Sequence, residues 1–156
     1  TWSGGGRGSY PTIETFDYTE TVVFGHVGKP FLTYSQRTTH AADGRQLHAE
    51  TGYLRLAGGG AGDRGGAELV VSHPTGVAEV SEGALTSDED GRLVFQLRSS
   101  TVAGSATAKS VVGIERDIVV DGDVLSYVVR MAAVGLPMTH HLEATLERVS
   151  ADRRAT

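Results

Sequence analysis

Apolar and polar side chains alternate along most of this chain, and a period of two restricts the elements that it can form. The segment GRLVFQLRSSTVA places Leu93, Phe95 and Leu97 on one face, with polar side chains between them. The segment DVLSYVVRMAAV at 123–134 repeats the pattern. Such alternation is typical of β-strands that bury one face and expose the other to water. No comparable helical stripe is present.

Short turn motifs separate the alternating runs. HVGKP at 26–30, ADGR at 42–45, DEDGR at 88–92 and VDGDV at 120–124 all contain glycine, and Asp-Gly pairs are typical of tight hairpins. The turns divide the chain into about ten strands of ordinary length. The expected ranges are 2–9, 16–26, 31–40, 46–56, 67–73, 76–84, 92–102, 108–120, 124–133 and 139–149.

Consecutive strands joined by short turns favour antiparallel pairing, and closing the sheet removes its open edges. Eight strands fill a barrel with side chains, whereas about ten leave room for a small ligand. We therefore predict an all-β, roughly ten-stranded, antiparallel up-and-down barrel of the lipocalin and fatty-acid-binding type. The last run, HHLEATLERV at 140–149, also has a helical spacing, but a strand there would close the sheet. Residues 1–149 are expected to form a single domain, and 150–156 a flexible tail.

Composition narrows the class of function. The net charge is −5 and no basic stripe occurs, which argues against nucleic acid and anionic membranes as partners. Cysteine is absent, so disulfides, thiolate nucleophiles and cysteine-based metal sites are excluded. This fits the reducing cytoplasm, although a secreted protein can also lack cysteine. No apolar run reaches the roughly 18 residues that span a bilayer. The chain starts at Thr1 without methionine, which leaves an upstream segment open.

The glycine-rich stretch GGGAGDRGG at 58–66 has two interpretations. It could cradle a phosphate, but it lacks the lysine and the following helix of a P-loop. A flexible hairpin tip is the preferred interpretation.

Histidines are the main candidates for chemistry. His26 and His40 lie beside turns and are expected at the surface, whereas the strand positions of His48 and His73 allow them to face a cavity. A zinc site would need three or four converging ligands, for example His48, His73 and one of the final pair. Neither an HExxH motif nor a cysteine pair supports that site. The chain has six histidines in all: His26, His40, His48, His73, His140 and His141.

Other catalytic groups are less well marked. The chain has no G-x-S-x-G motif, so a serine nucleophile is not indicated. Paired carboxylates of the glycosidase type remain open, but most aspartates and glutamates are expected on outward positions or in turns.

Five motifs in order resemble the nitrobindin family of small haem-binding β-barrels. They are TWSGGGRGSYPTI at 1–13, GHVGKPFLTYSQRT at 25–38, LHAETGYLRL at 47–56, HPTGVAEV at 73–80 and YVVRMAAVGLPMTHHL at 127–142. Each motif is weak alone, whereas their order and spacing together are specific. The resemblance implies a ten-stranded barrel that holds one ferric haem b, isomerises peroxynitrite to nitrate and binds nitric oxide.

The family pattern P-[LM]-x-x-H-L corresponds to residues 137–142 and implies that His141 is the axial iron ligand. Strict alternation favours His140 instead, because His140 shares a face with Leu142 and Leu146. A β-bulge at the barrel rim would reset the alternation. His141 is therefore the expected ligand and catalytic residue, and His140 is the alternative.

The resemblance also implies a wider haem-binding set. Thr12 and Lys109 are expected near the haem propionates. From the residues alone, Thr12 could equally be a turn or cap threonine, and Lys109, expected within a strand, a solvated surface lysine. The expected cavity wall consists of Leu47, His48, His73 and Met131.

Two other classes of function compete with the haem enzyme. One is a non-catalytic carrier barrel for a lipid or small hydrophobic ligand, because such carriers share the strand pattern. The other is a structural or partner-binding domain, which requires a fully packed interior. A homodimer through an outer face is also open.

Overall fold

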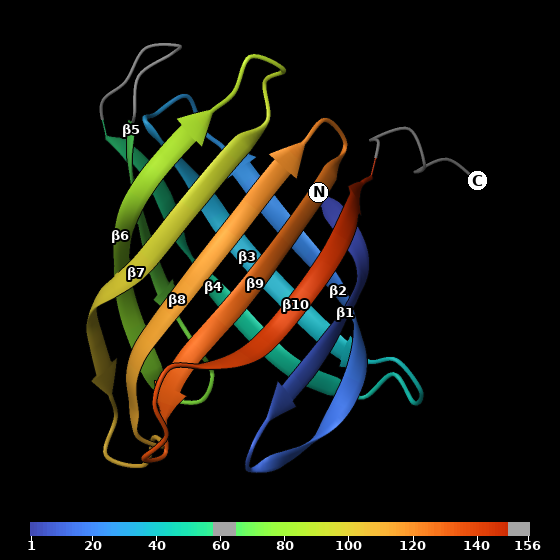
Figure 1. Cartoon of the computed structure of the whole chain (residues 1–156), viewed down its shortest axis with the longest axis vertical. Coiled ribbons are helices and arrows are strands. Elements are labelled where there is room, and N and C mark those ends of the chain that lie inside the picture. Colours follow the sequence, from blue (N-terminus) through green and yellow to red (C-terminus); the bar gives the residue numbers. More distant parts are fainter. Residues whose placement is uncertain (58–64, 150–156) are drawn as a thin grey trace.

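The computed structural model describes residues 1–57 and 65–149, which fold into a closed antiparallel β-barrel (Figure 1). Each strand pairs with its neighbours in the sequence, and β1 pairs with β10 to close the barrel. The predicted fold class is thus confirmed, and the last run is a strand. The strands are β1 (Trp2–Tyr10), β2 (Ile13–His26), β3 (Phe31–His40), β4 (Gln46–Ala57), β5 (Gly65–Ser72), β6 (Val77–Ser87), β7 (Leu93–Gly104), β8 (Val111–Asp121), β9 (Val124–Ala133) and β10 (Thr139–Arg148).

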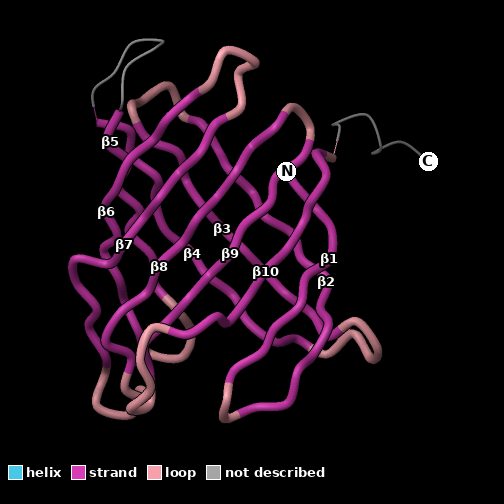
Figure 2. Tube along the Cα trace, viewed as in Figure 1, coloured by secondary structure: helices cyan, strands magenta, loops and turns pink. Residues whose placement is uncertain are grey.

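Loops are confined to the two ends of the barrel (Figure 2). The described part of the chain includes no helix that could cross a membrane. The proposed hairpin tip at 58–66 falls mainly, and the proposed tail at 150–156 entirely, outside the described residues.

One strand boundary changes the setting of a candidate site residue. Lys109 was expected within a strand, but β8 begins only at Val111, so Lys109 lies in the β7–β8 loop. Backbone groups of this loop form hydrogen bonds within the loop and to the β5–β6 turn. Ser105 N donates to Gly76 O at 2.8 Å, and Ala108 N donates to Ser105 O at 3.0 Å. These groups are therefore not available to extend the β-ladder.

The half of the barrel nearest the chain ends is filled with apolar side chains. Inward-facing residues of every strand pair pack there, because alternate positions point into the lumen. Leu97 and Leu146 are completely buried, and Trp2, Leu69 and Leu125 nearly so. Burial of each such side chain stabilises the fold by about 1.5–3 kcal/mol.

Below this apolar half lies a layer of buried polar side chains. Glu20, Glu50 and Glu79 are each less than 9% exposed, so the expectation that acidic residues face outward is wrong for these three. Each carboxylate has a buried partner. Tyr127 Oη and Gln36 Nε2 donate to Glu20 at 2.6 and 2.5 Å, whereas the guanidinium of Arg116 pairs with Glu50 and Glu79. Pairing offsets the desolvation that would otherwise keep such groups at the surface.

The glycines of β1 make room for an aromatic ring. A Cβ added at Gly6 would lie 2.3 Å from Cζ of Tyr18. Because Gly6 has no side chain, Tyr18 lies across β1, where its Oη is 2.8 Å from Tyr127 Oη and donates to Glu143 O at 3.2 Å. The glycine spacing of the first motif therefore serves packing around the polar layer.

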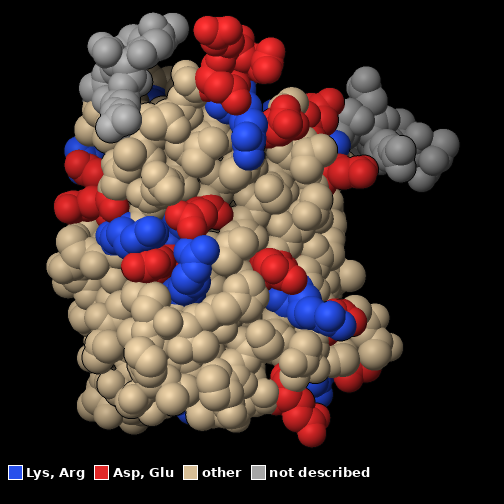
Figure 3. Space-filling view, viewed as in Figure 1, with Lys and Arg blue, Asp and Glu red and all other residues tan. Residues whose placement is uncertain are grey.

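The outer surface over β7–β9 carries charges of both signs in mixed groups (Figure 3). Arg98 lies 3.1 Å from Glu115, and Arg130 lies 2.6 Å from Asp117. These partly exposed pairs each contribute at most about 1 kcal/mol.

Candidate functional site

A cavity of about 600 Å³ occupies the half of the barrel away from the chain ends. The interior is not fully packed, which removes the condition for a purely structural domain. A cavity of this size accommodates a cofactor or a small ligand. The structure brings all seven predicted site residues to its wall: Thr12, Leu47, His48, His73, Lys109, Met131 and His141. Their individual roles in binding stay predictions.

A β-bulge in β10 decides which of the two adjacent histidines faces the cavity. His140 pairs with Arg130 of β9 and Leu142 pairs with Val129, so His141 is the extra residue between them. The extra residue resets the alternation, as the motif required. His141 lines the cavity, whereas the His140 side chain is 42% exposed and lies 4.0 Å from Glu143.

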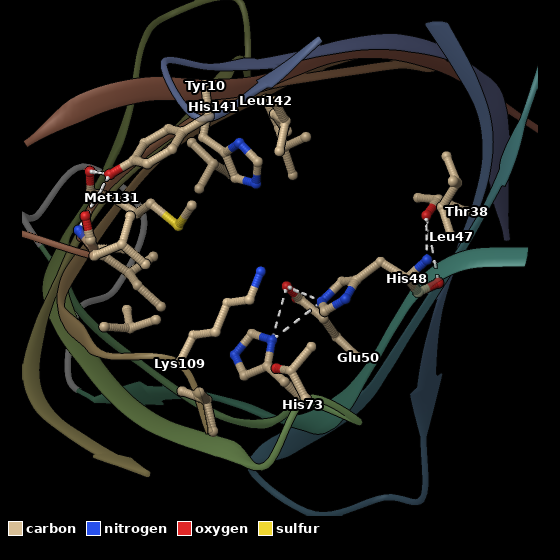
Figure 4. Close-up of a pocket in the computed structure, with 18 of the residues that line it drawn as sticks. Tyr10, Thr38, Leu47, His48, Glu50, His73, Lys109, Met131, His141 and Leu142 are labelled. Carbon is tan, nitrogen blue, oxygen red and sulfur yellow. Dashed lines mark hydrogen bonds and ion pairs between the residues drawn. The ribbon is translucent and has the colours of Figure 1, made fainter. Parts of the chain in front are cut away.

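The His141 ring is held in a single orientation and reaches into the cavity (Figure 4). Its Nδ1 lies 3.2 Å from the carbonyl oxygen of Ser9, which can only accept a hydrogen bond. The ring of Tyr10 packs edge-on at 5.4 Å, and Tyr10 Oη is itself fixed by Ala133 N at 3.1 Å. With the proton on Nδ1, Nε2 keeps a lone pair, as a metal ligand requires.

Burial keeps the His141 imidazole neutral. It lowers the pKa below the usual range for histidine, although the hydrogen bond to Ser9 O acts in the opposite direction. The neighbouring His48 and His140 add to the lowering. The side chain is therefore a neutral donor over the physiological pH range.

Thr12 and Lys109 lie at the mouth of the cavity. Thr12 is in the β1–β2 turn and Lys109 is in the β7–β8 loop, and both are exposed. Leu47 and Met131 contribute apolar surface to the wall of the cavity. The mouth therefore combines a hydroxyl and a single cation with an apolar interior, an arrangement that suits an amphipathic ligand with acidic groups.

The wall across the cavity from His141 is charged (Figure 4). His48 of β4 and His73 of the β5–β6 turn lie 3.2 Å apart between Nε2 and Nδ1, and both approach Glu50. Arg116 Nη2 donates to Glu50 Oε1 at 3.0 Å, and Tyr34 Oη donates to Glu50 Oε2 at the same distance. Burial alone would raise the pKa of Glu50, but Arg116 and the two histidines hold it well below the usual range.

A second buried acid lies in the polar layer. Burial raises the pKa of Glu20 to about 7, although hydrogen bonds from Tyr127 and Gln36 act against this rise. Glu20 therefore takes up a proton near neutral pH, whereas Glu50 stays ionised.

Sequence reasoning missed Tyr10, Glu20, Glu50, Glu79 and Arg116. A signal was present for the four charged residues, because each occupies an inward position of an alternating strand. Glu50 follows His48 by two residues, and Arg116 stands between Ile114 and Ile118. No sequence signal identifies Tyr10 as the support of His141, because that contact joins β1 to β9 and β10.

Comparison with known proteins gives a consistent result. Residues 1–148 match the family model described as "THAP4-like, heme-binding beta-barrel domain". The chain is 51% identical to a peroxynitrite isomerase of Nocardia farcinica over 148 residues, 95% of this chain and 84% of the relative. It is 48% identical to peroxynitrite isomerase 2 of Mycobacterium marinum over 150 residues, 96% and 89% of the two chains. The crystal structure of Rv2717c from M. tuberculosis superposes with a TM-score of 0.88 at 44% identity, covering 96% of this chain and 91% of the other.

Proposed function

Because the chain belongs to the family of THAP4-like haem-binding β-barrel domains, the nitrobindins, we propose that it binds haem b and isomerises peroxynitrite to nitrate. The observation that carries the proposal is His141, a neutral imidazole with a fixed tautomer that faces the cavity. Residues 1–149 act in this proposal as one haem-binding unit, with one ferric haem per chain.

The residues present fit the cofactor. His141 Nε2 would hold the haem iron, and the apolar wall of Leu47 and Met131 would contact the porphyrin. Thr12 and Lys109 at the mouth suit its propionates, because a hydroxyl donates a hydrogen bond and an ammonium pairs with a carboxylate. When bound, ferric haem would supply the iron chemistry for the rearrangement of peroxynitrite to nitrate.

The protein itself fixes the orientation and the tautomer of His141 and provides an apolar wall beside it. Ser9 O holds the proton of His141 on Nδ1, and Tyr10 restrains the ring. A neutral imidazole has a lone pair that can bind iron, whereas a protonated imidazole has none and cannot bind a metal. The apolar wall would limit the contact of bound haem with water, and the open mouth would admit a small anion.

Three finer parts of the proposal extend beyond the reaction. The haem-loaded protein is also expected to bind nitric oxide, so it would scavenge or sense reactive nitrogen species. A cytoplasmic location fits the absence of cysteine. A homodimer is proposed from the exposed apolar residues Tyr53 and Val70, which pair across β4 and β5 on the outer face.

The test begins with hemin titration of the purified protein. A Soret band should saturate at one haem per chain, and peroxynitrite added to the complex should decay faster and yield more nitrate than with free hemin. His141→Ala should remove most of the Soret intensity and the activity. His140→Ala is the matched control and should retain both, because its side chain is outside the cavity.

The opposite results favour the carrier barrel. If hemin binds no more tightly than to an unrelated β-barrel, or if His141→Ala leaves the spectrum unchanged, the proposed function fails.

A further inference from the structure

Three ligand atoms converge on the charged wall of the cavity. His48 Nε2 and His73 Nδ1 are 3.2 Å apart, and Glu50 Oε1 lies 3.5 Å from each of them. The three residues come from β4 and from the β5–β6 turn, so the barrel itself assembles them. All three line the cavity.

The carboxylate of Glu79 orients the ring of His73. His73 Nε2 lies 3.4 Å from Glu79 Oε2, and the two side chains are only 7% and 0% exposed. Within residues 1–57 and 65–149, neither atom makes a well-directed hydrogen bond. The carboxylate favours a proton on Nε2, which leaves the lone pair of Nδ1 facing His48 and Glu50. Metal-binding histidines are commonly oriented by a carboxylate in this way.

The spacing of the three atoms suits a tetrahedral ion. Bonds of about 2.0–2.1 Å, typical of zinc with nitrogen and oxygen ligands, separate tetrahedral ligand atoms by about 3.3–3.4 Å. The observed separations of 3.2, 3.5 and 3.5 Å bracket that value. An octahedral ion with the same bonds would bring neighbouring ligand atoms to about 2.8–3.0 Å.

Charge supports the same conclusion. Two buried carboxylates, those of Glu50 and Glu79, share the guanidinium of Arg116 on this wall. Arg116 Nη2 also donates to Glu50 at 3.0 Å and fixes that carboxylate. A divalent ion bound by the two imidazole nitrogens would place positive charge beside both carboxylates.

We propose that His48, Glu50 and His73 form a binding site for a divalent ion of the zinc class, with Glu79 as the positioning residue. The three residues line the cavity and the His48 side chain is 29% exposed, so an ion can reach them from the cavity. The site lies across the cavity from His141 (Figure 4), so it can be tested in haem-free protein.

Cobalt(II) tests the site in haem-free protein, because four-coordinate cobalt has intense visible bands. Chelator-treated wild-type protein should take up one equivalent of cobalt with these bands, and zinc should displace it. His48→Gln and His73→Gln should each remove the bands. Glu79→Gln should weaken binding by about 10–100-fold, the usual effect of removing a carboxylate that orients a ligand.

Two controls separate this site from other histidines. His141→Ala should bind cobalt like the wild type although it no longer binds hemin, so the proposal and the haem function can fail independently. The surface variant His26→Gln should also be unchanged. If the buried variant His73→Gln does not fold, His48→Gln carries the test, since its side chain is partly exposed. Absence of saturable cobalt uptake, or uptake that persists in His48→Gln, overturns the proposal.

Discussion

The two walls of the cavity place histidine in opposite environments. On β10, His141 has one backbone partner and aromatic and apolar neighbours, so its imidazole is a single neutral donor. Across the cavity, His48 and His73 lie beside Glu50 and Glu79 with Arg116 behind them. The same side chain is thus suited to a haem iron on one wall and to a divalent ion on the other. The difference comes from the neighbouring charges, which a sequence pattern does not show directly.

The largest expected effect comes from removing the cation of the charged wall. Arg116→Met leaves Glu50 and Glu79 buried without their partner, which should lower the free energy of unfolding by about 3–5 kcal/mol. Urea titration monitored by Trp2 fluorescence measures this loss. Hemin affinity of the protein that remains folded should be nearly unchanged, because His141 lies on the other wall.

A matched control for this variant is Arg98→Met. Arg98 is half exposed in its pair with Glu115, so its loss should lower stability by less than about 1 kcal/mol. Equal losses for the two variants would contradict the distinction between a buried charged wall and an ordinary surface ion pair.

A smaller effect is expected from the acid in the polar layer between the cavity and the apolar half. In the folded protein the pKa of Glu20 is raised to about 7 from 4.5, so the fold binds more protons than the unfolded chain between these values. The contribution of Glu20 to stability therefore falls as pH rises through this window, by about 3 kcal/mol in total. Glu20→Gln should remove this fall and be more stable than wild type at pH 8.

Chemical denaturation at pH 5 and pH 8 measures the difference between the two proteins. The exposed substitution Glu14→Gln should leave the pH dependence as it is in the wild type. A wild-type advantage over Glu20→Gln that grows between pH 5 and pH 8 would show that burial does not raise this pKa.

Much of the architecture was predictable because it depends on local patterns. The alternation around Leu93, Phe95 and Leu97 gave β7, and the positive φ of Gly44 and Gly91 fits their predicted Asp-Gly turns. Closure followed from the number of strands and the short connections. The family pattern and the alternation disagreed at His141, and the β-bulge at that point resolves the disagreement.

The charged wall was not predictable to the same degree. His48 and His73 were expected to face a cavity, but their common neighbour is Glu50 rather than one of the final histidines. That contact depends on the register between β4 and β5, in which Thr51 pairs with Ser72. The sequence does not encode the register between strands as a local pattern. The inward position of a single glutamate in a strand is only a weak signal of a buried site.

The pH dependence of hemin affinity tests the environment of His141. Burial lowers the pKa of His141, so its imidazole should stay neutral at pH values where an exposed histidine is half protonated. Hemin affinity should be nearly constant from pH 8 to 6.5 and then fall by up to about tenfold per pH unit below the lowered pKa. Soret titrations over this range measure the midpoint, and a midpoint at or above pH 6.5 would contradict burial as the dominant influence.

The smallest expected effect concerns the mouth of the cavity, where the two walls meet solvent. Lys109 is exposed there, so its ion pair with a haem propionate should contribute no more than about 1 kcal/mol and should weaken with salt. Lys109→Met should therefore weaken hemin binding by about fivefold at low salt and less at high salt.

Lys29→Met is the matched control, because Lys29 lies in the β2–β3 turn at the opposite end of the barrel. If both variants lose affinity equally, the effect comes from net charge and not from a contact at the mouth. A loss for Lys109→Met that approaches that of His141→Ala would mean that the mouth, rather than the two walls, dominates haem binding.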